Sequence, residues 1–438
     1  MCDDVAAPND AVPHLHRGLS NRHIQLIAIG GAIGTGLFMG SGRTISLAGP
    51  AVVVVYGIIG FFVFFVLRAM GELLLSNLNY KSFVDFSADL LGPAAGFFVG
   101  WSYWFAWIAT GIAEVVAIVC FIGVGAILLA TDFVSPQGHR ATVANLWNDG
   151  GFFATGFMGV VSRFQIAFFA FVGVELVGTA AAETVSPRRT LPRAINAVPL
   201  RVAIFYIGAL LAILTVVPWR QFASGESPFV MMFSLAGLAA AASIVNFVVI
   251  TAAASAANSG VFSTGRMLFG LADEGSAPAP FRRLNRGGVP ALALLPTAVL
   301  LLTSIPLLYV GGSVMGAFTL VTTISSLLFM FVWAMIVVSY LVYRRRHVQR
   351  HADSPYKMPA GVVMCWAILA FFAFVIWTLY TERETAIALA WFPLWFRVLA
   401  VGWLIVRRRP GRAERYRQFR AEMNQPIDEN VETTAPAA

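Results

Sequence analysis

Four glycines fall within seven residues of the first apolar stretch, at positions 30–36 with the sequence GGAIGTG. Glycine loses more backbone entropy on ordering than any other residue, so a helix is hard to maintain across this run. An unwound backbone in a bilayer exposes N–H and C=O groups, which is tolerated only where they line a cavity or hold a ligand. Such half-helix ends can bind both charged groups of a small zwitterion. The alternative is close packing of helices on small residues, and this run alone does not decide between the two.

A second interruption lies in the apolar stretch 153–177, which reads FAFVGVE from Phe169 to Glu175. An acidic residue this deep in a membrane span is costly and is a functional candidate by default. Together with Gly173 it predicts another break in a helix. Two interrupted helices far apart in sequence are typical of transporters built from inverted repeats. The alternative for Glu175 is an interfacial or structurally paired carboxylate.

Three further polar residues are candidates for lining a substrate path: Ser255, Asn258 and Thr322. The first two are set among alanines, where such residues more often form contacts between helices. Thr322 belongs to a group of hydroxyls in its span, and threonine often bonds back to its own helix. Their role in the path is therefore a hypothesis beside these structural alternatives.

Charged residues gather in the loop after the second apolar stretch. We interpret Glu72, Asp85 and Asp89, together with Arg68 and Lys81, as a charged cluster with a structural or gating role.

The composition excludes most soluble classes of protein. Of 438 residues, 58% are hydrophobic and only 12% are charged, and the mean hydropathy is +0.76. A soluble domain carries about twice that share of charge. The net charge of +8 does not indicate nucleic acid binding, because the basic residues lie between apolar runs and at the chain ends. We expect no cofactor and no metal, because the three cysteines lack metal-ligand spacing.

Nothing in the sequence predicts an enzyme. We find no Ser/His/Asp set and no phosphate loop, and the glycine run lies within an apolar span and not after a strand.

A membrane span needs roughly 20 apolar residues. The sequence has ten candidate segments: 24–47, 51–75, 94–130, 153–177, 199–219, 229–258, 290–310, 314–343, 361–381 and 386–406. We therefore predict a cytoplasmic tail over 1–23, a transmembrane domain over 24–406 and a second cytoplasmic tail over 407–438.

The segment 94–130 is long enough to cross once with an overhang or twice as a hairpin. With one crossing and a cytoplasmic N-terminus, 24 of the 30 Lys and Arg residues face the cytoplasm and four lie outside. With two crossings, 21 of them would lie outside. Positively charged loops favour the cytoplasm, so one crossing and two cytoplasmic termini are predicted.

These stretches resemble the amino acid–polyamine–organocation permeases, and in particular the bacterial amino acid permeases. The likeness runs from about residue 15 to 410 and is carried by IGGAIGTGLFMGSG in 21–50, RAMGELLLSN in 68–93, LWNDGG in 146–151, FAFVGVELVGTAAAE in 169–183, LPRAIN in 191–196 and ANSGVFSTGRMLFGLA in 257–272. Within the family, the closest likeness is to transporters of D-serine, D-alanine and glycine.

The resemblance implies an all-α polytopic membrane protein with a LeuT-like fold of two inverted five-helix repeats plus two added helices. It implies import of small neutral amino acids across the bacterial plasma membrane, driven by protons. The substrate carboxylate would bind N–H groups around Thr35 and Gly36, and its ammonium group would bind carbonyls near Ala32, Phe169 and Val172. Phe169 also matches the family's aromatic gate. The full set of candidate substrate-binding residues is Ala32, Ile33, Gly34, Thr35, Gly36, Phe169, Ala170 and Val172.

The chain departs from the family in length. The family has twelve spans where we count ten, and about fifty residues corresponding to the fourth span and half of the fifth are missing after residue 118. Many relatives carry a lysine in the fifth span that is proposed to couple protons to transport. Here Glu114 and Glu175 are the remaining candidates, because desolvation can bring a carboxyl group into the titrating range.

Two arginines, Arg163 and Arg397, also interrupt apolar runs, and the sequence offers no partner for either. The leading hypothesis is a proton-coupled importer of D-alanine, D-serine and glycine, with an undefined oligomeric state. The alternative is a truncated relative that does not transport, either decayed or sensing amino acids.

Overall fold

A computed structural model of the 438-residue chain describes nine ranges of residues: 34–38, 40–110, 143–179, 187–216, 218–222, 227–235, 239–285, 289–306 and 314–424. Within these ranges every regular element is a helix, in agreement with the all-α prediction.

Six helical stretches in the described residues are long and apolar enough to cross a membrane: Gly36–Ser76, Pro187–Thr215, Phe247–Asp273, Gly316–Arg346, Gly361–Thr378 and Thr385–Val406. Two shorter apolar helices, Gly156–Phe169 and Ala291–Pro306, accompany them. A hydrocarbon core of about 30 Å needs about 20 helical residues, so these lengths suit a polytopic membrane protein.

The first long stretch contains two of the predicted spans, joined at a sharp bend. It begins with α2 (Thr35–Phe38) and α3 (Gly40–Ala48), continues through the 3-10 turn η1 (Gly49–Ala51), and ends with α4 (Val52–Ser76). Gly49 has a φ of 60°, a left-handed conformation that glycine adopts without strain, and Pro50 follows it. The bend therefore falls between the predicted segments 24–47 and 51–75, although residues 24–33 lie outside the described ranges.

The segment 153–177 is broken, as the sequence predicts. It forms α7 (Gly156–Val161) and α8 (Phe164–Phe169), then turns through residues 170–175, and resumes as α9 (Leu176–Thr179). Gly173 in the turn has a φ of 107°, which an L side chain rarely adopts.

Two predicted segments have different bounds in the structure. The range 229–258 is divided into α11 (Pro228–Leu235) and α12 (Ala239–Asp273), so its second part continues 15 residues further than predicted. Hydroxyl groups in this extension bond back to the helix, as Thr264 does to the Val261 carbonyl at 2.8 Å, which lets polar residues continue an apolar helix. The segment 94–130 is described only as a helix over residues 93–110, so its predicted fusion point lies outside the described residues.

The remaining helices complete the bundle. They are α5 (Phe83–Leu91), α10 (Pro187–Val216), α13 (Ala291–Leu301), α15 (Val314–Arg346), α16 (Val348–Asp353), α17 (Gly361–Thr378), α18 (Arg383–Val406) and α19 (Arg412–Met423), with the 3-10 turns η2 (Val143–Leu146), η4 (Trp219–Gln221), η5 (Ala279–Arg282) and η6 (Leu379–Thr381).

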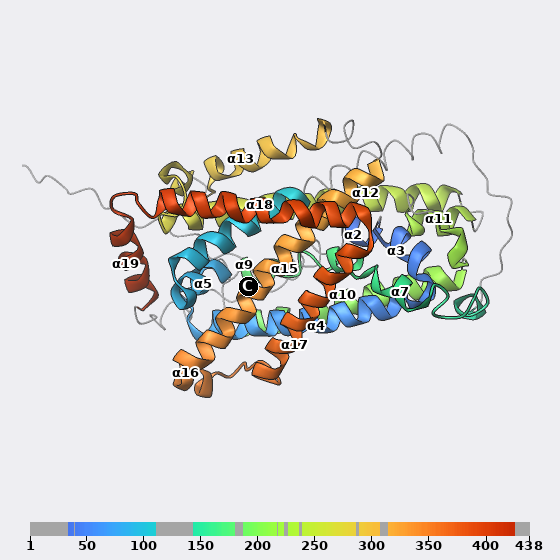
Figure 1. Ribbon diagram of the computed structural model, residues 1–438, viewed down its shortest axis with the longest axis horizontal. Helices are drawn as coiled ribbons and strands as arrows, with labels where there is room; N and C mark the ends of the chain where they lie inside the picture. The colour runs from blue at the N-terminus through green and yellow to red at the C-terminus, as the bar shows by residue number, and fades with distance from the viewer. Residues whose placement is uncertain are drawn as a thin grey trace, which may run out of the picture.

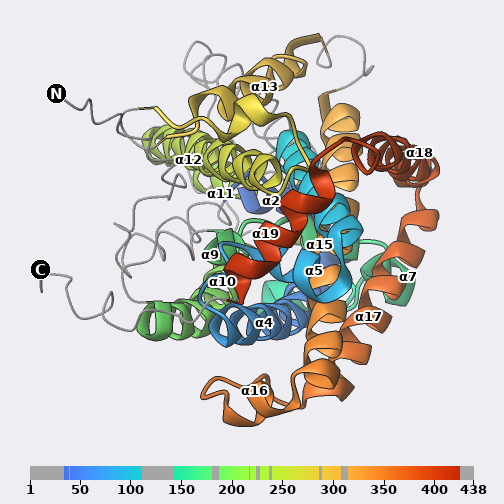
Figure 2. The same ribbon diagram turned by 90° about the vertical axis from the view of Figure 1, so that its left-hand side faces the viewer.

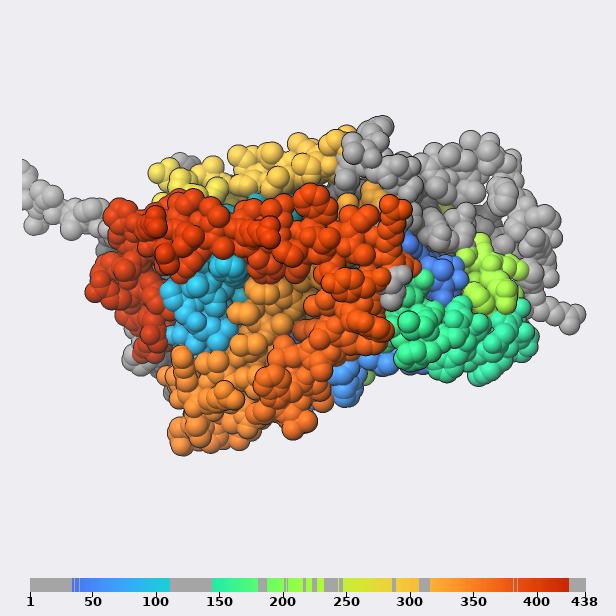
Figure 3. Space-filling model, in the orientation of Figure 1, coloured from blue at the N-terminus to red at the C-terminus, as the bar shows by residue number. Residues whose placement is uncertain are grey.

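α15 lies at the centre of the bundle and α18 at its edge. Within their most apolar windows, 72% of α15 is buried but only 11% of α18. α15 packs against α4, α5, α8, α17 and α18, whereas α18 runs along the surface of the molecule (Figures 1 and 3). Such a peripheral apolar helix is suited to contact with lipid.

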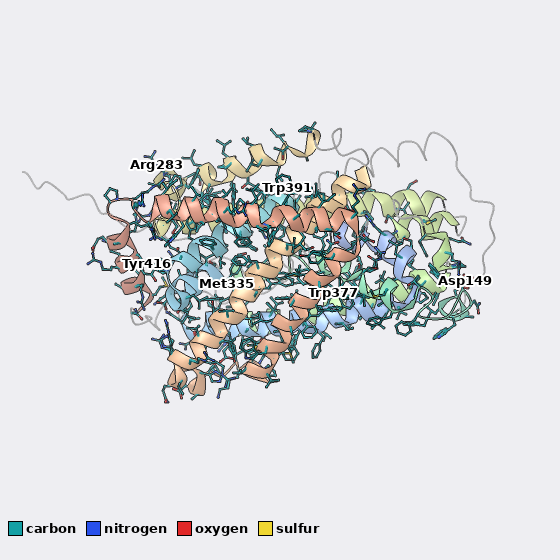
Figure 4. All side chains as sticks on the ribbon, viewed as in Figure 1. Asp149, Arg283, Met335, Trp377, Trp391 and Tyr416 are labelled. Atoms are coloured by element: carbon teal, nitrogen blue, oxygen red, sulfur yellow. The ribbon has the colours of Figure 1, made fainter. Side chains whose placement is uncertain are left out.

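The two ends of the molecule carry different segments. α5, α16 and α19 lie at one end of the long axis and α3, α7 and α11 at the other (Figure 1). Figure 4 likewise places Tyr416 and Arg283 near one end and Asp149 at the other. The predicted topology places the segments of α5, α16 and α19 on the cytoplasmic side, and this orientation stays a prediction.

The C-terminal helix α19 docks beside α5 (Figure 2). The Asn77 amide donates to the Met423 carbonyl at 2.7 Å, and the Tyr416 hydroxyl donates to the Ala88 carbonyl at 2.8 Å. The first part of the segment after residue 406 is therefore packed against the bundle.

Candidate functional site

The two interrupted helices meet at Gly36 and Ala170. A Cβ atom added at Gly36 would lie 2.7 Å from the Ala170 Cα atom and 3.0 Å from the Phe169 ring. Real Cβ atoms do not approach backbone this closely, so only glycine fits where α2 faces the end of α8. The structure thus brings together the two stretches that the sequence predicts to bind substrate, although Ala32, Ile33 and the Thr35 side chain lie outside what it describes.

Some backbone carbonyls in the second interruption accept hydrogen bonds and others do not. The Val172 N–H donates to the Phe169 carbonyl at 3.1 Å, and the Tyr206 hydroxyl donates to the Ala170 carbonyl. Among the described residues, no donor is bonded to the Val172 carbonyl. A carbonyl in this position has the chemistry to accept a hydrogen bond from an ammonium group.

Aromatic rings surround the place where the interruptions meet. Phe169 is buried and packs edge-on against Phe318 of α15, with ring centroids 6.3 Å apart. Phe38 of α2 packs edge-on against Phe229 of α11 at 4.9 Å. These contacts join α2 and α8 to neighbouring helices, and the gating role of Phe169 stays a prediction.

Glu175 is fully buried and stabilises the break in its own helix. One carboxylate oxygen accepts from the Gly173 N–H at 3.0 Å, and the other accepts from the Tyr103 hydroxyl at 3.3 Å. These hydrogen bonds support the alternative that Glu175 is a structurally paired carboxylate. A structural role of this kind is compatible with a role in proton transfer. The other candidate, Glu114, lies outside the described residues.

The predicted path-lining residues occupy different environments. Thr322 is buried on α15, and its hydroxyl donates to the Phe318 carbonyl at 2.8 Å. Ser255 and Asn258 are exposed on α12. Within the described ranges, no hydrogen bond joins either of them to residues 34–36 or 169–175. Their role in the path stays a prediction.

Arg163 has a partner that the sequence did not reveal. Its guanidinium forms an ion pair with Glu382, which precedes α18, and Glu382 also pairs with Arg43 of α3 at 3.2 Å. Arg43 additionally donates to the Thr319 hydroxyl of α15 at 2.5 Å. This outer ion cluster, defined as Arg43, Arg163 and Glu382, therefore ties both broken helices to the loop before α18. Arg397 is exposed on α18.

The charged residues predicted after the second span separate into two networks. Glu72 accepts from the Tyr340 hydroxyl at 2.9 Å and from the Met358 N–H at 2.7 Å, and also bonds His351. Lys81 instead pairs with Asp273 at the end of α12, at 2.9 Å. They do not form one cluster, because α5 turns the second group toward α12.

In the part of the chain that the structure describes, no group of three His, Cys, Asp or Glu residues could hold a metal ion.

In the described residues, an all-helical bundle in which a broken helix contacts the glycine-rich start of the first helix is typical of membrane transporters. The family model for amino acid permeases matches residues 23–125 and 112–410, so the chain belongs to the amino acid permease family.

Curated relatives agree with this assignment. The D-serine/D-alanine/glycine transporter of Escherichia coli strain K12 is 52% identical over 93% of this chain and 97% of its own length. The amino-acid permease AapA of Bacillus subtilis is 40% identical over 90% of this chain and 96% of its own length. The probable threonine/serine transporter YbxG of the same species is 37% identical over 86% of this chain and 91% of its own length.

The alignments also support the predicted shortening. The alignment with the Escherichia coli relative has 459 positions, but 93% of 438 residues is only about 407, so about 50 positions have no residue in this chain. The two family matches overlap at residues 112–125, around the predicted junction. The junction itself lies outside the described residues.

Proposed function

We propose that this chain is a permease of the bacterial inner membrane that imports D-alanine, D-serine and glycine together with protons. The contact between Gly36 and Ala170 is the observation that carries the proposal, because it unites the two predicted halves of the substrate site. The extensive identity with the D-serine/D-alanine/glycine transporter supports the choice of substrates.

In this proposal, the substrate carboxylate binds N–H groups around Thr35 and Gly36, and its ammonium group binds the carbonyls of Ala32, Phe169 and Val172. A helix N-terminus favours an anion and a helix C-terminus favours a cation, so the two breaks suit a zwitterion. The close approach of α2 to α8 leaves little room for a large side chain, which favours small amino acids.

Protons supply the driving force in this proposal, and no cofactor is required. Both lysines of the chain, Lys81 and Lys357, lie between predicted spans, and all six histidines lie outside the spans in the predicted topology. Carboxylates within the membrane, Glu114 or Glu175, are left to carry the proton. Both termini face the cytoplasm, as the distribution of Lys and Arg favours.

One observation favours the alternative of a relative that does not transport. About 50 aligned positions have no residue in this chain, and their loss would leave backbone groups of the broken helices with less protein around them. The uptake experiment below decides between the two functions.

The test is uptake of radiolabelled D-alanine, D-serine and glycine in cells lacking their own permeases, with the amount of protein in the membrane measured in parallel. We expect saturable uptake that a protonophore abolishes. Gly36→Val serves as the inactive variant, and Gly208→Ala in α10 as the matched control, since nothing lies within 4 Å of a Cβ there. Folded wild-type protein without uptake would favour the alternative, and binding without uptake would indicate a sensor.

A further inference from the structure

A row of hydroxyl groups leads away from Glu175 toward the end of the molecule that carries α5 and α19. The Tyr103 hydroxyl donates to Glu175 at 3.3 Å. The Ser263 hydroxyl of α12 lies 3.2 Å from the Tyr103 oxygen and 3.3 Å from the Thr179 hydroxyl. Each hydroxyl can donate one hydrogen bond while accepting another, so the row can relay a proton once the Thr179 hydroxyl turns from the Leu176 carbonyl, to which it donates at 3.1 Å, toward the cavity.

The row ends at a small cavity. Thr179 lines this cavity of about 30 Å³ together with Lys81 and Asp85. A polar cavity needs a volume of about 10–15 Å³ to hold one water molecule. The cavity therefore has room for water between Thr179 and Asp85, which both line it. The cavity thereby connects the broken helix to α5.

Beyond the cavity, Asp85 and Glu274 form a buried carboxyl pair. Both residues are 4% exposed. Burial raises the pKa of the Asp85 carboxyl, and the hydrogen bonds that it accepts from the N–H groups of Lys81 and Ser82 only partly oppose this rise. Burial raises the pKa of the Glu274 carboxyl well above its usual value, and the neighbouring Asp85 charge raises it further. The raised pKa favours a proton on the Glu274 carboxyl, and one oxygen of that carboxyl has no hydrogen-bond partner among the described residues.

Several other charged groups lie near the Asp85–Glu274 pair, and some of them form ion pairs with other residues. Lys81 and Arg282 both pair with Asp273 at 2.9 Å. Arg412 and Tyr416 of α19 interact electrostatically with Glu274. Glu422 contributes to the field at Lys81, and Arg266 lines the cavity. The carboxyl pair therefore lies near basic groups and also near Asp273, whose negative charge raises the pKa of both carboxyl groups.

We propose that the Asp85–Glu274 pair is the inner proton acceptor of this permease, reached from Glu175 through Tyr103, Ser263, Thr179 and water in the cavity. The inference rests on the proposed proton symport. The O–H bond of protonated Glu175 breaks, each hydroxyl passes on one proton as it receives another, and a new O–H bond forms at Asp85. Glu175 is left as a carboxylate, and the pair then releases one of its two protons to the cytoplasm.

Purified full-length protein in liposomes tests this route with two assays. Accumulation of labelled D-alanine driven by an imposed pH gradient requires proton transfer. Exchange of labelled for unlabelled D-alanine at equal pH requires only binding and the conformational change. Because a merely structural defect lowers both rates, loss of accumulation alone identifies a residue of the route.

Four variants make the test specific. We expect Glu274→Gln and Thr179→Val to lower accumulation at least tenfold while exchange stays within twofold, and Thr179→Ser, which keeps the hydroxyl, to restore accumulation. Asp353→Asn is the matched control, an exposed carboxylate at the same end of the molecule, bonded to Gln349. Accumulation unchanged in both Glu274→Gln and Thr179→Val would overturn the route while leaving proton symport intact. Wild-type uptake that a protonophore does not reduce would overturn the proposed symport and the route together.

Discussion

Arg163, at the start of α8, forms an ion pair with Glu382, 219 residues later in the chain. Both side chains are largely buried, and the same carboxylate also pairs with Arg43 of α3. One anion therefore holds two cations from the two broken helices. Because Glu382 lies outside both broken helices, the outer ion cluster fixes their outer halves to the edge of the bundle.

Glu382→Gln should destabilise the protein more than Arg163→Met does. The first change leaves two guanidinium groups facing each other without a carboxylate, at a cost of about 2–4 kcal/mol. The second leaves Glu382 paired with Arg43 and removes a costly buried cation. The unfolding temperature in detergent measures both effects. A larger fall in unfolding temperature for Arg163→Met would show that the ion pair with Arg43 does not by itself stabilise the Glu382 carboxylate.

Gly36→Ala should abolish D-alanine uptake or reduce it at least tenfold. The added methyl group would lie 2.7 Å from the Ala170 Cα atom and force α2 away from α8. Gly270→Ala in α12 is the control, because its methyl group would meet nothing within 4 Å. Initial uptake rates, normalised to protein in the membrane, give the comparison. Normal uptake by Gly36→Ala would mean that the two breaks separate during transport.

The sequence predicted the interruption at residues 170–175 because its signal is local, and it predicted another at 30–36, most of which lies outside the described residues. A glycine lowers the stability of a helix at the position where it occurs, and a carboxylate is costly at its own position in an apolar span. Each signal can therefore be read from a few neighbouring residues. The contact between Gly36 and Ala170 could be anticipated only through the family resemblance. The extension of α12 to Asp273 was missed because hydropathy falls while hydroxyl groups still bond back to the helix.

The partners of the buried charges could not be read from the sequence. Glu382 meets Arg163 across 219 residues and Tyr103 meets Glu175 across 72, distances at which no periodicity connects two side chains. Nor could the sequence show that Lys81 turns toward Asp273, which separates it from Glu72. Ion pairs and hydrogen bonds of this kind depend on tertiary packing, which brings together residues far apart in the sequence.

Glu175→Gln should transport with an altered dependence on external pH. The amide oxygen can still accept from the Gly173 N–H, so the turn is retained, but the side chain can no longer bind and release a proton. Uptake between pH 5 and 8 is the measurement. An unchanged profile would exclude Glu175 as the coupling group and direct the same test to Glu114.

Glu274→Gln should make the stability of the folded protein less dependent on pH. The pKa of the Glu274 carboxyl is raised in the folded state by burial and by Asp85. Above the ordinary carboxyl pKa the unfolded chain releases this proton while the folded chain retains it, so stability is greatest at low pH and falls as pH rises toward the folded pKa. A glutamine has no proton to lose, and this contribution disappears. Unfolding temperatures measured from pH 5 to pH 9 should fall more steeply for the wild type than for the variant. Parallel curves would mean that Glu274 does not hold its proton in the folded state, and Asp353→Asn, which alters an exposed carboxylate, should follow the wild-type curve.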